Sequence, residues 1–214
     1  RISTMKDNIN YHVQKTRQYW HIDGLAELVA GGIFLFLGAY FFALSALPPN
    51  SLLNTLLQAG FALIFIGSLL LGKRLVTAFK ARLTFPRTGF VAYRPPTNRS
   101  RWISAGLAFI MAALVVALIA RSPASFAWLP AITGLIVGGA WLIFASRLGL
   151  PRFFLLAIVS LAFGIGLSLT GLGDILGLAI YYALMGLTLL LSGGLTLRSY
   201  LKQAPAPREE PDES

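Results

Sequence analysis

The stretch ILGLAIYYALMGLTLLLSGGLTL, residues 175–197, decides the fold class, because none of its 23 residues is charged. A helix of roughly 20 apolar residues crosses the hydrocarbon core of a bilayer, which is about 30 Å thick. Five other stretches have the same character, and Glu27 is the only charged residue inside any of the six: they are residues 25–47, 52–72, 102–120, 126–145 and 153–170. The sequence therefore predicts six transmembrane helices.

The composition of the whole chain supports a membrane protein. Its 214 residues are 56% hydrophobic and 12% charged, whereas a typical soluble domain has about 25% charged residues. Soluble globular and intrinsically disordered proteins are therefore excluded. The chain has no cysteine, which excludes disulfide bonds, a thiolate nucleophile and thiolate metal ligands. We expect an all-α polytopic membrane protein.

Short connections divide the predicted helices into three antiparallel hairpins, because links of four to seven residues keep consecutive helices side by side. Only the connection 73–101 is long. The predicted organisation has six parts: an amphipathic cytoplasmic N-terminal arm (1–24), hairpin 1 (25–72), a basic cytoplasmic loop (73–101), hairpin 2 (102–145), hairpin 3 with its flanks (146–202) and a disordered acidic tail (203–214).

The distribution of basic residues predicts how the chain is threaded. Seventeen of the 18 Lys and Arg residues fall on one side of the six-helix topology, and only Arg121 falls on the other. The positive-inside rule places the basic side in the cytoplasm, together with both termini. We predict a multi-pass protein of the inner (plasma) membrane. The net charge of +10 matches this topology and anionic lipid. We expect no nucleic-acid partner, because no folded basic module lies outside the helices.

The basic loop contains the candidate contacts to anionic lipid. In residues 73–85, apolar side chains at helical spacing have basic neighbours, a pattern typical of an amphipathic helix at the membrane surface. Residues 86–89 (PRTG) then predict a turn. This turn either serves only as a tight turn at the interface, which is the favoured interpretation, or presents a hydroxyl and backbone N–H groups to an anion. The candidate contacts are Lys73, Arg74, Lys80, Arg82, Arg87 and Thr88. Two interpretations stay open: the loop binds lipid headgroups, or it docks a cytoplasmic protein partner.

Two carboxylates near the start of the first predicted helix are the candidate proton or ion site. Asp23 and Glu27 are four residues apart and share one helix face. Charged residues at membrane depth are often functional. Capping and ion pairing are the favoured explanation, because Asp23 stands where a helix N-cap belongs and Glu27 lies only one turn inside. Asp174 has the same N-cap placement before the last helix.

No enzyme or cofactor signature appears in the sequence. The zinc motif His-Glu-x-x-His, the nucleophile elbow Gly-x-Ser-x-Gly and the P-loop are all absent. We therefore expect no catalytic activity, no metal and no cofactor. Pairs of small residues four apart predict close helix contacts; they are Gly134 and Gly138, Ala108 and Ala112, and Ala162 and Gly166. The run 192–194 (SGG) is explained by packing or by an unwound binding site.

Two motifs carry a family resemblance. Residues 19–27 (YWHIDGLAE) lead into the first predicted helix, and residues 84–91 (TFPRTGFV) follow the second. Together they resemble an uncharacterised group of bacterial multi-pass inner-membrane proteins that pair a DGLxE entry with a TxPRTGYV turn. The resemblance covers about 85 residues, with Phe90 where the group usually has Tyr. It implies a bacterial inner-membrane protein and implies no activity.

The sequence favours a non-catalytic function. We expect an accessory or interaction protein of the bacterial inner membrane, whose basic cytoplasmic face binds anionic headgroups or a protein partner. The alternative is a small-solute or ion transporter that uses Asp23 and Glu27. The sequence leaves the oligomeric state open.

Overall fold

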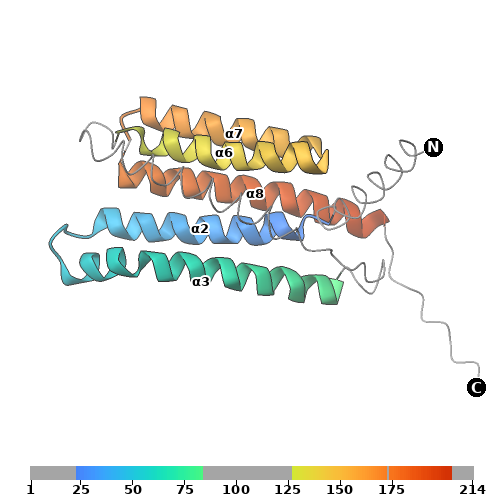
Figure 1. The fold of residues 1–214 in the computed structure, drawn as a ribbon, viewed down its shortest axis with the longest axis horizontal. Coiled ribbons are helices and arrows are strands. Elements are labelled where there is room, and N and C mark those ends of the chain that lie inside the picture. Colours follow the sequence, from blue (N-terminus) through green and yellow to red (C-terminus); the bar gives the residue numbers. More distant parts are fainter. Residues whose placement is uncertain (1–22, 84–126, 173, 204–214) are drawn as a thin grey trace, which may run out of the picture.

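The computed structural model describes residues 23–83, 127–172 and 174–203, and these residues form an all-helical protein. Five of its helices are long and apolar enough to cross a membrane. They are α2 (Leu25–Ala46), α3 (Leu52–Leu83), α6 (Leu129–Leu148), α7 (Pro151–Leu169) and α8 (Ile175–Gln203) (Figure 1). The helical class is therefore confirmed. The predicted helix 102–120 and the PRTG turn lie outside the described residues, as do residues 1–22 of the predicted N-terminal arm and residues 204–214 of the predicted tail.

The helices are ordered differently in space than in the chain. Helix α8 lies between the α6–α7 pair and α2, and α3 lies beyond α2 (Figure 1). The most extensive contacts join α2 to α8 and α6 to α7. Neither pair is one of the predicted hairpins. Helices α2 and α8 come from opposite ends of the chain, and α6 and α7 belong to two different predicted hairpins. Short links keep helices that are consecutive in the chain near each other. The closest helix contacts, however, form where small residues lie, as described next.

Small residues repeat every seven positions along the α2–α8 contact. They are Gly31 and Gly38 of α2 together with its N-cap residue Gly24, and Ala179, Gly186 and Gly193 of α8. Each α2 glycine faces its counterpart across the antiparallel pair: a Cβ on Gly31 would lie 2.9 Å from the Gly186 carbonyl oxygen. Such close backbone approach is typical of helix contacts in membranes. The stripe therefore sets the distance between these two helices, and Gly193 serves packing within an intact helix.

The α6–α7 contact confirms one predicted small-residue pair. A Cβ on Gly134 would lie 2.7 Å from the Ser160 carbonyl oxygen, and one on Gly138 would lie 3.1 Å from the Ala157 carbonyl oxygen. Gly166 differs, because a Cβ there would meet nothing within 4 Å. The Ser160 hydroxyl donates to the Gly134 carbonyl oxygen over 2.9 Å and lies 2.7 Å from the Tyr181 hydroxyl. This network ties α6, α7 and α8 together inside the bundle.

Helix α3 continues without a break beyond the predicted membrane boundary at residue 72. The basic segment predicted as a separate surface helix is the last part of this 32-residue helix. At 1.5 Å per residue, α3 is about 48 Å long and extends well past a 30 Å hydrocarbon core. Gly72 does not end the helix, because it packs against Ile33 of α2. Two further boundaries move for local reasons: Gly149 ends α6 at φ 66°, and Pro151 begins α7.

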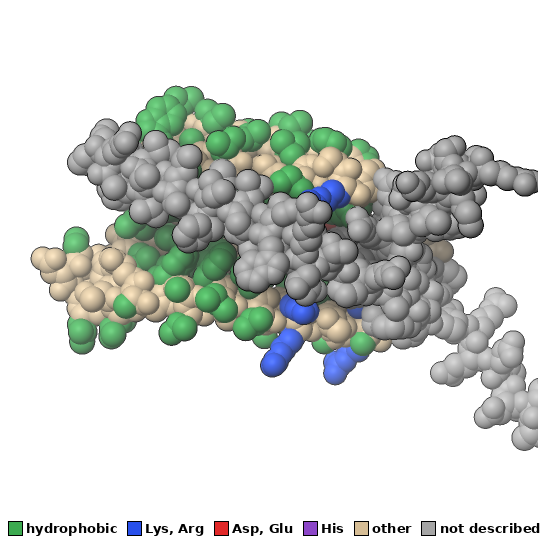
Figure 2. Space-filling view, viewed as in Figure 1, with side chains coloured by type: hydrophobic (Ala, Val, Ile, Leu, Met, Phe, Trp, Pro, Cys, Tyr) green, Lys and Arg blue, Asp and Glu red, His purple; other side chains and the backbone are tan. Residues whose placement is uncertain are grey.

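The bundle has many apolar side chains on its outside and three charged side chains in its interior. Exposed large hydrophobic residues lie on the outward sides of α3, α6 and α7, and green side chains appear along the upper and lower edges of Figure 2. Asp23, Glu27 and Lys80 are buried in contrast, with relative exposures of 1%, 2% and 2%. This inverted distribution is consistent with a membrane location, since an apolar exterior is favourable in lipid.

Candidate functional site

Every Lys and Arg of the described residues lies at one end of the bundle. This basic end is formed by the start of α2, the end of α3, the end of α6, the start of α7 and the end of α8. Its eight basic residues are Lys73, Arg74, Lys80, Arg82, Arg147, Arg152, Arg198 and Lys202. Within the described residues, Asp23 and Glu27 are the acids of this end, and Asp174 stands at the opposite end.

Asp23 and Lys80 form a buried ion pair between α2 and α3. The Lys80 Nζ lies 2.6 Å from the Asp23 Oδ2, and both side chains are almost fully buried. The Asp23 Oδ1 accepts a hydrogen bond of 3.2 Å from the Leu25 backbone N–H. Charges removed from water are costly unless they are paired and hydrogen-bonded, as this carboxylate is. The pair therefore fixes the end of α3 to the start of α2.

Glu27 joins α2 to α7 and α8. Its Oε1 lies 2.9 Å from the Arg152 Nη2, and its Oε2 accepts a 2.7 Å hydrogen bond from the Ser192 hydroxyl. Arg152 also donates from Nη1 to the Thr196 hydroxyl oxygen over 2.9 Å. The Arg152 side chain is 22% exposed, so one partner of this ion pair reaches the surface. Four polar side chains from three helices thus share one cluster.

The structure separates the two carboxylates that the sequence grouped as one candidate site. Asp23 pairs with α3, whereas Glu27 pairs with α7 and α8. Both are engaged in ion pairing, as one of the two open interpretations expects. Asp23 also accepts the first N–H of α2, although the N-cap residue itself is Gly24. The predicted N-cap at Asp174 is confirmed, because its Oδ1 accepts a 3.0 Å hydrogen bond from the Leu176 N–H.

The candidate anion contacts fall into three groups. Lys73, Arg74 and Arg82 are exposed on α3. Lys80 is not available to a lipid headgroup, because its ammonium group is buried against Asp23. Arg87 and Thr88 lie outside the described residues. Lys73 and Arg74 border a shallow depression on the outer face of α3 that also includes Thr77.

Sequence reasoning missed the partners of Glu27. Ser192 and Thr196 are four residues apart and so share a face of α8, a pattern visible in the sequence. Arg152 follows Pro151 at the start of α7, which places a cation near a membrane boundary. Bringing these side chains to Glu27 requires the register between α2, α7 and α8, which no local pattern contains.

No protein-family model, curated protein or solved structure matches the chain. Within residues 23–83, 127–172 and 174–203, no group of three or more His, Cys, Asp or Glu side chains could hold a metal ion. The site that the structure offers is the basic end itself, where two buried carboxylates form ion pairs beneath an exposed basic surface.

Proposed function

We propose that the chain is a non-catalytic accessory or interaction protein of the bacterial inner membrane, whose basic end contacts anionic lipid on the cytoplasmic side. The observation that carries this proposal is the charge balance of that end. Six of its eight basic side chains are exposed, whereas its two acids within the described residues are buried in ion pairs. The exposed surface is thus strongly positive, and each basic residue near an anionic leaflet contributes about 1 kcal/mol of attraction.

The same end supports a six-helix topology. The Asp23–Lys80 pair places the end of α3 at the basic end. Helix α6 starts at the opposite end, where the Ala131 N–H donates to the Ser168 hydroxyl near the end of α7. We therefore infer that the chain between α3 and α6 crosses from one end of the bundle to the other. The apolar stretch 102–120 is long enough for that crossing, and both termini then lie on the cytoplasmic side.

Ion or solute transport is the alternative, and it has less support. A transport carboxylate must exchange a proton or an ion during the cycle. Glu27 is held by Arg152 and Ser192, and Asp23 is held by Lys80 and the Leu25 N–H. Both carboxylates also lie at one end of the bundle, away from its middle. Proton- or cation-coupled flux in proteoliposomes that disappears in Glu27→Gln would make transport the better explanation.

Lipid selectivity of the full chain tests the proposed function. We expect the protein, reconstituted in equal amounts of phosphatidylglycerol and phosphatidylethanolamine, to retain phosphatidylglycerol preferentially in native mass spectrometry. The double variant Lys73→Gln/Arg74→Gln should lower that preference, and added salt should lower it further in both proteins. Equal retention of the two lipids by the unmodified chain would refute the proposal.

A further inference from the structure

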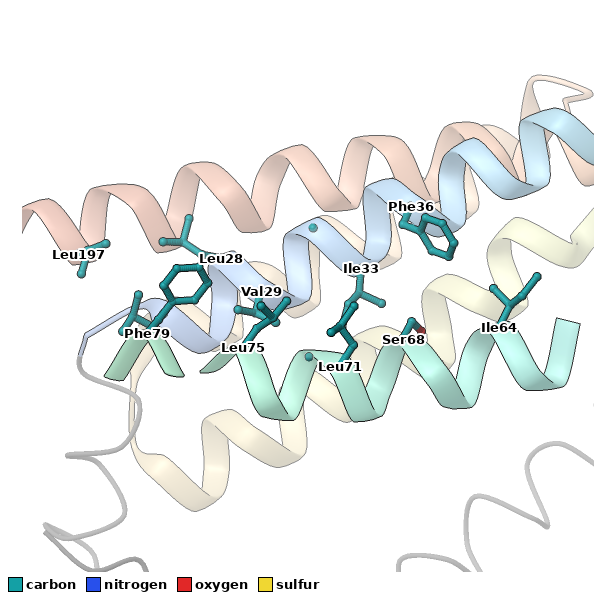
Figure 3. A pocket seen from close by; sticks show the side chains of 13 residues that line it. Leu28, Val29, Ile33, Phe36, Ile64, Ser68, Leu71, Leu75, Phe79 and Leu197 are labelled. Carbon is teal, nitrogen blue, oxygen red and sulfur yellow. The ribbon is translucent and has the colours of Figure 1, made fainter. Parts of the chain in front are cut away.

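An apolar groove of about 700 Å³ runs between α2 and α3 on the outside of the bundle. Figure 3 shows Val29, Ile33 and Phe36 of α2 on one side and Leu71, Leu75 and Phe79 of α3 on the other. Ser68 is the only polar side chain of its lining. Water in such a groove would find almost no hydrogen-bond partner, so the surface suits a hydrocarbon chain.

Two glycines give the groove its shape. At Gly72, a Cβ would lie 2.6 Å from the Ile33 Cδ1, so this glycine brings α3 close to α2 at the floor. At Gly32, a Cβ would meet nothing within 4 Å, so the groove stays open above that residue. The opening thus results from a missing side chain at one position and close helix contact at the other.

The groove is about one leaflet deep. On α3 it extends from Ile64 to Phe79, which is about 22 Å along the helix at 1.5 Å per residue. Phe79 lies close to the basic end, and Ile64 lies toward the middle of α3. One leaflet, counted with its headgroup region, occupies half of a bilayer that is about 40–45 Å thick. The groove therefore starts at the membrane surface on the basic side and ends near the bilayer centre.

The mouth of the groove carries a positive charge. Arg82 is exposed and stands three residues after Phe79, so both lie on the same face of α3. The nearest acid of the described residues, Asp23, is buried against Lys80 and presents no charge at the surface. An anionic headgroup at the mouth would meet a guanidinium group that is well suited to bind phosphate.

We propose that this groove binds one anionic phospholipid of the cytoplasmic leaflet, with an acyl chain between α2 and α3 and the phosphate on Arg82. The site rests on the proposed function and makes it specific, because it assigns a single bound lipid to one groove. It is separate from the surface around Lys73 and Arg74, which lies on another face of α3.

The test uses two kinds of substitution in the full chain: one fills the groove with a side chain, and the other removes the positive charge at its mouth. Gly32→Leu places a side chain in the open space, and Gly139→Leu is its matched control, since Gly139 is also a helical glycine with nothing within 4 Å of its Cβ position. Arg82→Gln removes the mouth charge, and Arg147→Gln is its control, because Arg147 is an exposed arginine in the last turn of α6. The probe is phosphatidylglycerol, with phosphatidylethanolamine as the neutral competitor.

We expect the unmodified chain to keep one phosphatidylglycerol molecule in native mass spectrometry after the other lipids are stripped by detergent. Gly32→Leu should lose it, and Arg82→Gln should retain it about fivefold less, the effect of losing one basic contact. Both control variants should retain it. The lipid preference that depends on Lys73 and Arg74 should persist in Gly32→Leu, which separates failure of this site from failure of the proposed function.

Three results would overturn the groove site. Full retention of the lipid in Gly32→Leu would place the lipid elsewhere. The chain itself would fill the groove if Gly32→Leu had a lower melting temperature and if a Gly32→Cys variant formed cross-links to residues 102–120. Loss of a dimer in Gly32→Leu would show that a second copy does.

Discussion

Neutralising Asp23 should destabilise the protein more than neutralising Glu27. The two carboxylates are almost equally buried, but their partners differ: the Lys80 side chain is 2% exposed, and the Arg152 side chain is 22% exposed. Asp23→Asn keeps the side-chain size and an acceptor for the Leu25 N–H, so the substitution removes only the charge that balances Lys80. The buried Lys80 ammonium group then loses the negative charge of Asp23.

The expected magnitudes follow from this difference. Removing one partner of a buried ion pair costs about 3–5 kcal/mol, because the remaining charge stays desolvated. We expect Asp23→Asn to lower the free energy of unfolding by an amount in that range. Glu27→Gln should cost about 1–3 kcal/mol, since Arg152 can move toward water and the Ser192 hydroxyl still has an acceptor. The double variant Asp23→Asn/Lys80→Met should recover most of the lost stability, because it removes both charges and keeps an apolar chain of similar length.

Reversible unfolding in mixed micelles, followed by circular dichroism, measures the free energy of unfolding of all four proteins. The reasoning requires the order unmodified chain, Glu27→Gln, Asp23→Asn, from most to least stable, with recovery in the double variant. If Asp23→Asn unfolds with the same free energy as Glu27→Gln, Lys80 reaches water and the burial argument is refuted. If the double variant is no more stable than Asp23→Asn, the stranded charge is not the cause of the loss.

Three further predictions concern packing and topology. Gly31→Val should lower the melting temperature strongly while the adjacent Gly32→Ala leaves it unchanged, because only the first Cβ meets the α8 backbone; equal effects in thermal unfolding would contradict the close contact. Tyr181→Phe should lower the free energy of unfolding by about 0.6 kcal/mol, the average for a hydrogen bond inside a membrane protein, and no change would show that the Ser160 contact contributes nothing. A reporter at the C-terminus should be active in the cytoplasm and one at Pro49 outside it; an external C-terminus would exclude six helices.

The sequence predicts best what depends on neighbouring residues. Helices α2 and α8 were located because an apolar stretch of more than 20 residues with at most one charge is a local property. The cap at Asp174 was predictable for the same reason, since a carboxylate and the N–H two residues later are close in any helix start. The continuation of α3 past residue 72 was not predicted, because the ion pair of Lys80 with Asp23 joins residues 57 positions apart.

The partners of the two carboxylates show where sequence reasoning stops. Glu27 and Ser192 are separated by 165 positions, and only the packing of α2 on α8 brings them together. One signal for that packing was present in the sequence: glycines seven apart in α2 and small residues seven apart in α8. A shared period of seven is typical of helices that pack along one seam. This shared period would have allowed us to predict that the first and last helices pack against each other.

The same seven-residue period allows two alignments of α8 on α2, and the glycines alone do not distinguish between them. If α8 slid by one repeat, about 10.5 Å along α2, Gly24 would face Gly186, and Gly31 would face Ala179. That alternative alignment still offers two close contacts, so shape discriminates weakly against it. Glu27 would, however, move from Ser192 to the position of Met185, a buried apolar side chain. A buried carboxylate without a polar partner is costly, much as one polar residue selects the register of a coiled coil. The charge cluster at the basic end thus decides between two alignments that the small residues leave almost equivalent.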